Sequence, residues 1–280
     1  MSEFEKNFAK TNGIKLHYYR TGGDKPPIIL SHGVTDNGLC WTPVTRILEK
    51  DFDVIMPDAR GHGLSDAIGP HTMDNLAKDL IGLIEVLNLD KVILMGHSMG
   101  AQTSAQTAAM RPDLVSKLIL EDPPGGSMPF VRFLPNFLLK RLVVFMFKRM
   151  LLKPLKGKSP EEMKAICKKD NPKWSDDEIQ PWVTSKIQLF QNNPEQMFDS
   201  FMSSASEDSN FQLELIEGIQ CPVLLIISEK GLTKKETAQR LTKEVWHSSR
   251  YVEIKNAGHN IRRENFEDFM QVVKSNLSSQ

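Results

Sequence analysis

Short apolar segments recur along the chain and are separated by segments with helical spacing of their apolar residues. The apolar segments lie within PPIILSHG, FDVIMPDARG, KVILMGHS, VSKLILEDPP, CPVLLIISEK and RYVEIKNAGHN. Between the second and third of these, the apolar residues Leu76, Leu80, Leu83, Ile84 and Leu87 recur every three or four positions. Apolar strands that alternate with helices are typical of a parallel sheet buried on both faces. The pattern therefore predicts an α/β fold.

The first twenty residues follow another pattern. Polar and apolar residues alternate on both sides of Asn12-Gly13. This dipeptide tolerates the positive φ angles of a tight hairpin turn. The chain is therefore expected to open with an antiparallel β-hairpin.

The alternation of strands and helices stops between about Pro123 and Asn210. A segment of more than eighty residues is too long for a loop, so we expect a mostly helical subdomain over residues 123–210. Residues 1–122 and 211–280 would then form the core domain. Two stretches, SPEEMKAICKKD and WSDDEIQPWVTSKIQLFQ, each begin with a serine and early acidic residues, which predicts a helix with a serine N-cap in each.

Composition limits the classes of partner. The chain has 35 basic and 35 acidic residues, so its overall charge attracts neither nucleic acid nor an anionic surface. Its three cysteines, Cys40, Cys167 and Cys221, are odd in number and widely spaced, which favours reduced thiols. The N-terminus lacks the apolar region of a signal peptide, and the longest apolar run is Leu142 to Phe147. We expect a soluble, cytoplasmic protein.

One serine stands at a break between a strand-like and a helix-like segment. Gly96-His97-Ser98-Met99-Gly100 fits the pattern G-x-S-x-G, and it follows an apolar run and precedes an alanine-rich helix. Glycines two residues on either side let the turn close sharply, which exposes the serine hydroxyl beside the N–H groups that begin the helix. Ser98 is the candidate nucleophile.

A serine hydroxyl needs a general base, and the base needs an orienting acid. His259 is the best candidate base, because it lies in a turn after the last predicted strand and therefore at the same edge of the sheet as Ser98. The other histidines are interpreted as structural, solvated or packing residues: His17, His32, His62, His71, His97 and His247. Their spacing matches no zinc site, and we expect neither a metal nor a cofactor.

The loop SHGVTDNGLCW follows another predicted strand. A small, glycine-containing turn there can aim the N–H of Val34 at the pocket, where it would form a two-donor oxyanion hole with the N–H of Met99. Asp36 and Asn37 are interpreted as turn formers.

Taken together, these motifs resemble the α/β-hydrolase superfamily over nearly the whole chain. The matching segments, in order, are Ser31-His32-Gly33-Val34, the stretch from Asp58 to Asp66, the elbow Gly96 to Gly100, and Gly258-His259. The resemblance implies an eight-stranded, mostly parallel sheet with a helical cap inserted after the sixth strand. It also implies Ser98 as nucleophile, His259 as base, and oxyanion donors at Val34 and Met99. Serine at the elbow argues against the dehalogenase and epoxide-hydrolase branches, which use aspartate there.

The chain departs from this family at the triad acid. Many members carry G-x-x-D after the strand read here as PVLLIIS, whereas this chain has Ser228-Glu229-Lys230-Gly231. Some members place the acid one strand earlier, where this chain has Asp122 at the carboxyl end of a strand and before two prolines. Asp122 is therefore the candidate acid and Glu229 the alternative. Glu121 is expected to point to the other face, because neighbouring strand residues alternate.

The segment from Pro129 to Lys158 carries eight basic residues and no acidic one, and is otherwise mainly Leu, Phe, Val and Met. It predicts a cap helix that extends its basic side chains into water, or a surface that touches anionic lipid. Its Phe and Met content, together with Met99, suggests an apolar acyl pocket. Trp41, Trp174 and Trp182 either line the pocket mouth or pack in the ordinary way.

These features favour a cofactor-free serine hydrolase that cleaves a small, apolar carboxylic ester or related acyl compound through an acyl-enzyme on Ser98. Lactone, thioester, amide or carbon–carbon bond cleavage would use the same residues. A second hypothesis is a hydrolase-fold binding protein or receptor with weak or no turnover, which the glycine at position 231 favours.

Overall fold

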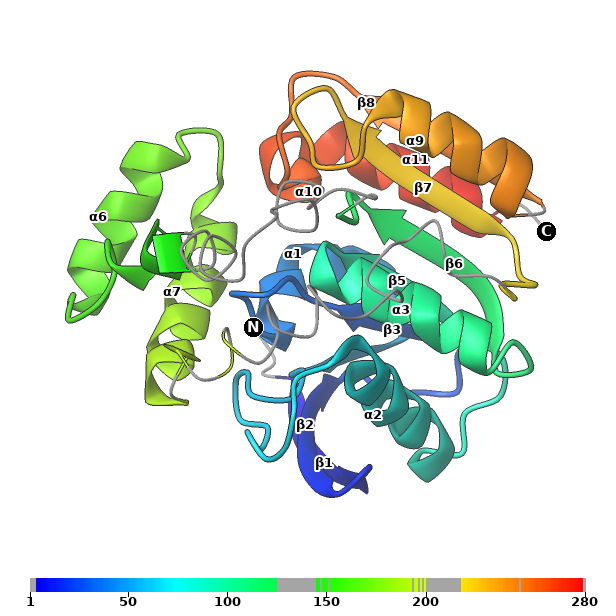
Figure 1. The fold of residues 1–280 in the computed structure, drawn as a ribbon, viewed down its shortest axis with the longest axis horizontal. Coiled ribbons are helices and arrows are strands. Elements are labelled where there is room, and N and C mark those ends of the chain that lie inside the picture. Colours follow the sequence, from blue (N-terminus) through cyan, green and yellow to red (C-terminus); the bar gives the residue numbers. More distant parts are fainter. Residues whose placement is uncertain are drawn as a thin grey trace, which may run out of the picture.

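The computed structural model describes residues 4–124, 145–146, 148–150, 152–192, 194–195, 197, 199, 218–246 and 248–278. Within these residues, eight strands form one sheet in the order β1-β2-β4-β3-β5-β6-β7-β8 (Figure 1). The strands are β1 (Glu5–Thr11), β2 (Ile14–Arg20), β3 (Pro27–Ser31), β4 (Asp53–Pro57), β5 (Val92–His97), β6 (Val115–Glu121), β7 (Val223–Ser228) and β8 (Ser249–Ile254). β2 pairs antiparallel with β1 and β4, and the other pairs are parallel. The predicted mostly parallel sheet is confirmed.

Helices cover both faces of this sheet, because side chains on alternate strand positions are buried on opposite sides. One apolar core lies under α2 (Met73–Val86), α3 (Met99–Met110) and α9 (Lys235–Arg240), which continues into the single π-helical turn η4 (Leu241–Val245). The other lies under α1 (Thr42–Leu48), α10 (Ile261–Glu264) and α11 (Phe266–Ser278), with the short 3-10 helix η1 (Gly38–Trp41) beside it. Leu94 and Met95 on β5 illustrate the alternation, since each belongs to a different core.

The N-terminal hairpin forms as predicted. β1 and β2 pair antiparallel from Glu5 opposite Arg20 to Thr11 opposite Ile14. Asn12 and Gly13 both adopt positive φ angles, 43° and 78°, as a two-residue hairpin turn of this twist requires.

In the described part of the segment between β6 and β7, a pair of helices stands beside the carboxyl ends of the parallel strands (Figure 1). They are α6 (Pro160–Asp170) and α7 (Asp176–Gln191), which confirms both predicted helices. Ser159 and Glu162 form the expected capping box of α6. Ser175 occupies the N-cap position of α7, as predicted, but its side chain makes no cap hydrogen bond. The acidic residues Asp176, Asp177 and Glu178 fill the first turn of α7 instead, where the helix dipole favours negative charge.

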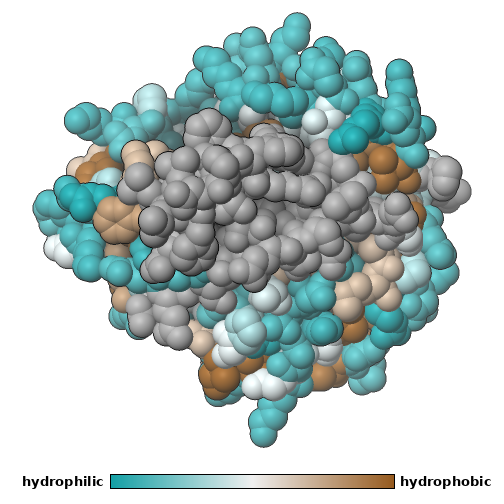
Figure 2. Space-filling view, in the orientation of Figure 1, coloured by the Kyte–Doolittle hydropathy of each residue, from teal (hydrophilic) through white to brown (hydrophobic). Residues whose placement is uncertain are grey.

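The division into a core domain and a cap over residues 123–210 stays a prediction, because residues 200–217 lie outside the described part of the chain. Much of the segment from Pro129 to Lys158 also lies outside it. Three of its described side chains, Phe145, Met146 and Met150, are exposed. On the face seen in Figure 2, hydrophobic residues gather in small separate patches among hydrophilic ones. Contact of this segment with lipid remains a prediction, and no helix in the described ranges is long and apolar enough to cross a bilayer.

Helix α3 lies unusually close to the sheet at its first turn. A Cβ atom on Gly96 would come within 2.2 Å of the Gly100 carbonyl oxygen, and one on Gly100 within 2.2 Å of the Ser31 carbonyl oxygen. Both neighbours are backbone atoms that side-chain movement cannot relieve. Gly96 and Gly100 are therefore needed for this close contact, as the motif predicted.

Substitution of Gly100 by alanine is expected to lower the free energy of unfolding by more than about 2 kcal/mol, because the added methyl overlaps fixed backbone. Gly13 is a matched control: nothing lies within 4 Å of its would-be Cβ, and alanine there meets only the cost of its φ of +78°. Gly13→Ala should cost about 1 kcal/mol. Urea unfolding of both variants measures the difference, and equal losses would contradict the close-contact explanation.

Candidate active site

Ser98 occupies a strained turn between β5 and α3. Its φ and ψ angles are 53° and −116°, outside the regions that residues other than glycine readily adopt. Such a conformation costs about 1–3 kcal/mol and persists only where the surroundings fix it. The Ser98 N–H donates to the Glu121 carbonyl oxygen at 3.0 Å, which ties the turn to the end of β6. The residue is 7% exposed, so it lies deeper than the exposed hydroxyl that the motif predicted.

His259 lies in the loop between β8 and α10, at the same edge of the sheet. Its Nδ1 is 2.7 Å from Oδ2 of Asp122, and its side chain is 31% exposed while that of Asp122 is fully buried. Two further contacts fix the loop: the Nε2–H of His97 donates to the His259 carbonyl oxygen at 3.0 Å, and the two rings lie 4.6 Å apart. The structure thus brings the predicted base and the predicted acid into contact.

Asp122 stands directly after β6 with a φ of +39°. Its carboxylate accepts the N–H of Leu232 at 2.8 Å and that of Thr233 at 3.1 Å. A Cβ on Gly231 would lie 2.4 Å from its Oδ1. The loop after β7 therefore carries glycine where many family members have the acid, and this glycine leaves the space that the Asp122 carboxylate fills.

The two other candidate acids lie elsewhere. Glu229 is exposed and forms no hydrogen bond or ion pair with the described residues. Glu121 is fully buried, and its carboxylate pairs with Arg262, accepting the backbone N–H at 2.9 Å and Nη1 at 3.0 Å. Neither carboxylate makes a contact with the His259 ring.

The loop after β3 runs beside Ser98. A Cβ on Gly33 would lie 3.7 Å from the Ser98 Cβ and 2.9 Å from Nδ1 of His97, so a side chain there would crowd the elbow. His62 Nε2 lies 2.8 Å from the Val34 carbonyl oxygen and fixes the direction of that peptide. Across the described ranges, the N–H groups of Val34 and Met99 have no acceptor. Neither predicted donor is therefore engaged by another of the described residues.

Ser98 Oγ makes no hydrogen bond to His259 within the described residues. This agrees with enzymes in which the bond between nucleophile and base forms only with substrate present. The elbow and the base are nevertheless linked, since His97 immediately precedes Ser98 and contacts His259 through both its ring and its Nε2.

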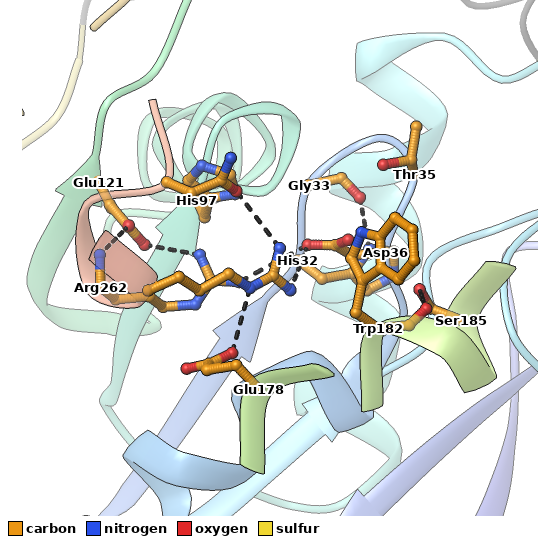
Figure 3. Close-up of polar contacts among 12 residues, drawn as sticks. His32, Gly33, Thr35, Asp36, His97, Glu121, Glu178, Trp182, Ser185 and Arg262 are labelled. Carbon is orange, nitrogen blue, oxygen red and sulfur yellow. Dashed lines mark hydrogen bonds and ion pairs between the residues drawn. The ribbon is translucent and has the colours of Figure 1, made fainter. Parts of the chain in front are cut away.

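Sequence reasoning missed a cluster of buried charges below these loops (Figure 3). Asp36, interpreted as a turn former, accepts ion pairs from Lys186, Arg263 and Arg262. Burial alone would raise the pKa of Asp36, but these three cations hold it well below its ordinary value. The adjacent arginines after His259 were a visible signal, whereas Lys186 and Glu178 lie about 150 and 85 positions from their partners in the cluster.

The cysteines and the remaining histidines are packing residues in the described structure. The three thiols are free and buried, and burial raises the pKa of Cys167 and of Cys221 to about 11. His17 pairs with Asp58 at 2.8 Å, and His247 lies outside the described residues.

No group of three His, Cys, Asp or Glu among residues that the structure describes is arranged to hold a metal ion.

His32 is neutral in the folded protein. Its Nδ1 donates to the Gly33 carbonyl oxygen at 2.8 Å, and its Nε2 accepts the Ala59 N–H at 3.0 Å, which a single neutral tautomer satisfies. Burial, with a smaller effect of His62, lowers the pKa of His32 to about 4.

This pKa predicts a loss of stability in weak acid. Between the ordinary value of 6.5 and about 4, His32 takes up a proton only in the unfolded chain. Its contribution to the free energy of unfolding should therefore fall by about 1.4 kcal/mol per pH unit as pH falls through this window. His32→Gln removes the contribution. Urea unfolding of both proteins at several pH values should give a steeper slope for the wild type, and identical slopes would refute the assignment.

Comparisons with known proteins show similarity over most of the chain. The chain is 28% identical to the N-formylmaleamate deformylase of Pseudomonas putida over 271 residues, which cover 93% of this chain and 92% of the deformylase. The solved structure of an E-2-(acetamidomethylene)succinate hydrolase aligns with a TM-score of 0.76 and 20% identity, over 99% of this chain and 100% of that one. The enol-lactonase of Burkholderia xenovorans LB400 aligns with a TM-score of 0.68 and 26% identity, over 98% and 100% of the two chains.

The family model described as alpha/beta hydrolase fold matches residues 26–265. This range includes every element from the strand β3 to the end of α10, and with it the elbow, the loop after β3 and the contact between Asp122 and His259. The chain belongs to the α/β-hydrolase fold family.

Proposed function

We propose that this protein is a serine hydrolase that cleaves a carboxylic ester or related acyl compound through an acyl-enzyme on Ser98. The observation that carries the proposal is the contact of 2.7 Å between His259 Nδ1 and Asp122 Oδ2. The buried carboxylate, held by two backbone N–H groups, orients the histidine so that Nε2 remains available for the serine proton. The strained elbow, the partly exposed His259 and the free donors of Val34 and Met99 support the same conclusion.

The reaction follows from these roles. His259 Nε2 takes the Ser98 proton as Oγ attacks the substrate carbonyl carbon, and the negative charge collects on the carbonyl oxygen. The N–H groups of Val34 and Met99 bind that oxygen, each lowering the barrier by about 3 kcal/mol. The C–O bond breaks as His259 returns the proton to the leaving alcohol. A water molecule deprotonated by the same histidine then releases the acid and restores Ser98.

The same groups would cleave an amide, with the histidine proton passing to the leaving amine. A relative that aligns over nearly the full chain is a deformylase, so hydrolysis of an N-acyl bond is a second candidate reaction. A lactone would react in the same way and keep both products in one molecule. In each case the proposed chemistry at Ser98 is unchanged, and only the leaving group differs.

A hydrolase-fold binding protein without turnover is the remaining alternative. Its sequence support was Gly231, which replaces the acid found in many relatives. Because a Cβ at this position would lie 2.4 Å from the Asp122 carboxylate, Gly231 makes room for an acid supplied by β6. The glycine therefore supports a relocated acid rather than a lost one, and we favour the enzyme.

A fluorophosphonate probe tests the nucleophile. We expect it to label the wild-type protein at one site, because an activated serine attacks the phosphorus, and not to label Ser98→Ala. Ser116→Ala is the matched control: this serine lies on β6, bonded through its Oγ to the Val92 carbonyl oxygen, and its loss should leave labelling intact. Intact-protein mass spectrometry reads both results. An unlabelled wild type would favour the binding protein.

A pair of isosteric substitutions tests the acid. Asp122→Asn should lower kcat for p-nitrophenyl acetate by about 10⁴-fold, because the histidine would lose its orienting charge and its correct tautomer. Glu229→Gln changes an exposed carboxylate on the neighbouring loop and should leave kcat unchanged. The opposite result, a large loss for Glu229→Gln alone, would assign the acid to Glu229.

A further inference from the structure

We propose that Asp36 is a positioning residue that links docking of the cap helix α7 to assembly of the catalytic loops. The inference rests on the proposed function and goes beyond it, since it concerns a residue that touches neither substrate nor nucleophile. It predicts that a change on α7 alters the loops of the oxyanion donor and of the base.

The carboxylate of Asp36 is the point where three separate elements meet. The residue is 4% exposed, and its N–H donates to the Gly33 carbonyl oxygen at 3.0 Å, which closes the turn that contains Val34. Oδ1 lies 3.1 Å from Lys186 Nζ on α7, and Oδ2 lies 3.0 Å from Arg263 Nη2 on α10. Nη2 of Arg262, also on α10, lies 3.6 Å from the same oxygen.

The cluster around Asp36 contains a near neighbour of three of the proposed catalytic groups. Asp36 comes two residues after Val34, Glu121 comes directly before Asp122, and Arg262 comes three residues after His259. Glu121 and Arg262 pair with each other, as described above. The cap helix α7 supplies two further members, Glu178 and Lys186. Glu178 pairs with Arg263 of α10 at 3.1 Å, and Lys186 pairs with Asp36. Figure 3 shows Asp36, Glu121, Glu178 and Arg262 gathered beside the loop that contains Gly33.

The charges of the cluster balance and are closed off from water. Its three carboxylates, Asp36, Glu121 and Glu178, face its three cations, Lys186, Arg262 and Arg263, and all six are buried. A tryptophan ring covers each cation: Trp41 lies 4.2 Å from Arg262, Trp174 lies 4.6 Å from Arg263, and Trp182 lies 5.0 Å from Lys186. Buried charges are tolerated only when they are paired. If one member moved away, its partner would remain buried as an uncompensated charge, which is strongly destabilising.

Lys186 carries the link from the cap to the oxyanion loop. Besides its ion pair with Asp36, its ammonium group donates to the Thr35 carbonyl oxygen and, at 3.0 Å, to the Thr35 hydroxyl. Thr35 directly follows Val34, whose N–H is the proposed oxyanion donor. With α7 docked, the peptides on both sides of Thr35 are held, from the cap by Lys186 and from the core by His62. Undocking of α7 would release the loop that contains Val34. It would also remove the ion pairs that Lys186 and Glu178 make with Asp36 and Arg263.

Hydrogen exchange of the full-length protein tests this link without reference to activity. We expect Lys186→Met, a change on α7, to raise exchange about tenfold or more in two distant segments, residues 33–37 and 260–264. Asp53→Asn is the control, because it breaks another ion pair of a buried carboxylate, that with the partly exposed Arg20, at the opposite end of the parallel strands. It should raise exchange only around β2 and β4. Faster exchange confined to α7 in Lys186→Met would overturn the proposal.

Activity provides the second readout. Lys186→Met and Asp36→Asn should lower kcat for p-nitrophenyl acetate by about a hundredfold, because a small displacement of the donor and base loops removes the reactive alignment. KM for this small ester should change little, since the cluster touches no substrate. A purely structural role would lower the melting temperature and leave kcat of the folded fraction at the wild-type value, and that result would overturn the proposal.

The double variant Asp36→Asn, Lys186→Met separates charge balance from the physical link. It removes one carboxylate and one cation, so its melting temperature should recover relative to Asp36→Asn, while its kcat should remain low because the cap and the loop are no longer joined. Recovery of both would mean that charge balance alone matters and would refute the positioning role. If the wild type fails to react with fluorophosphonate, the proposed function fails, while the exchange comparison still decides the link.

Discussion

Buried carboxylates organise the catalytic edge of this sheet, because a charge removed from water is stable only where donors or cations meet it. Asp122 is met by two backbone N–H groups of the loop after β7 and by His259. Asp36 is met by three cations from two helices. Each carboxylate therefore requires a particular arrangement of segments that lie far apart in the sequence. The same requirement that keeps these charges stable also fixes the loops of the proposed active site.

The proposed acid, Asp122, shows how the geometry of the family site can be kept when a different strand supplies the carboxylate. The histidine needs a carboxylate oxygen beside Nδ1, and it does not matter which strand supplies it. Here β6 supplies it, and the loop after β7 contributes the N–H groups of Leu232 and Thr233 together with the space above Gly231. An acid at both positions would place two carboxylates within contact of each other, and like charges at that distance cannot both ionise. Glycine at 231 and aspartate at 122 are thus one arrangement rather than two independent differences.

The features that the sequence could predict are those set by residues close together in the chain. The hairpin at Asn12-Gly13, the strands and the glycines of the elbow follow from residue type and spacing within a few positions, and the fold followed from them. The contact of His259 with Asp122 was accessible because both follow predicted parallel strands, whose carboxyl ends share one edge. The role of Asp36 was not, because its partners lie on α7 and α10, and the residue alone looks like any aspartate in a turn. Ser175 occupies the predicted N-cap position of α7, but whether its side chain makes the cap hydrogen bond depends on a rotamer that residue type does not fix.

The strained backbone of Ser98 is held by contacts that connect it to the charge cluster. A non-glycine residue at φ 53° and ψ −116° stays there only if the surrounding contacts outweigh the cost. Those contacts come from the close packing of Gly96 and Gly100 and from the hydrogen bond to the Glu121 carbonyl oxygen. Glu121 is itself held by Arg262, which also approaches Asp36. The strained Ser98 and the loops of the proposed base and oxyanion donor thus share one set of supports. In the proposed mechanism, a reactive geometry at Ser98 therefore depends on charges that never contact the reacting atoms.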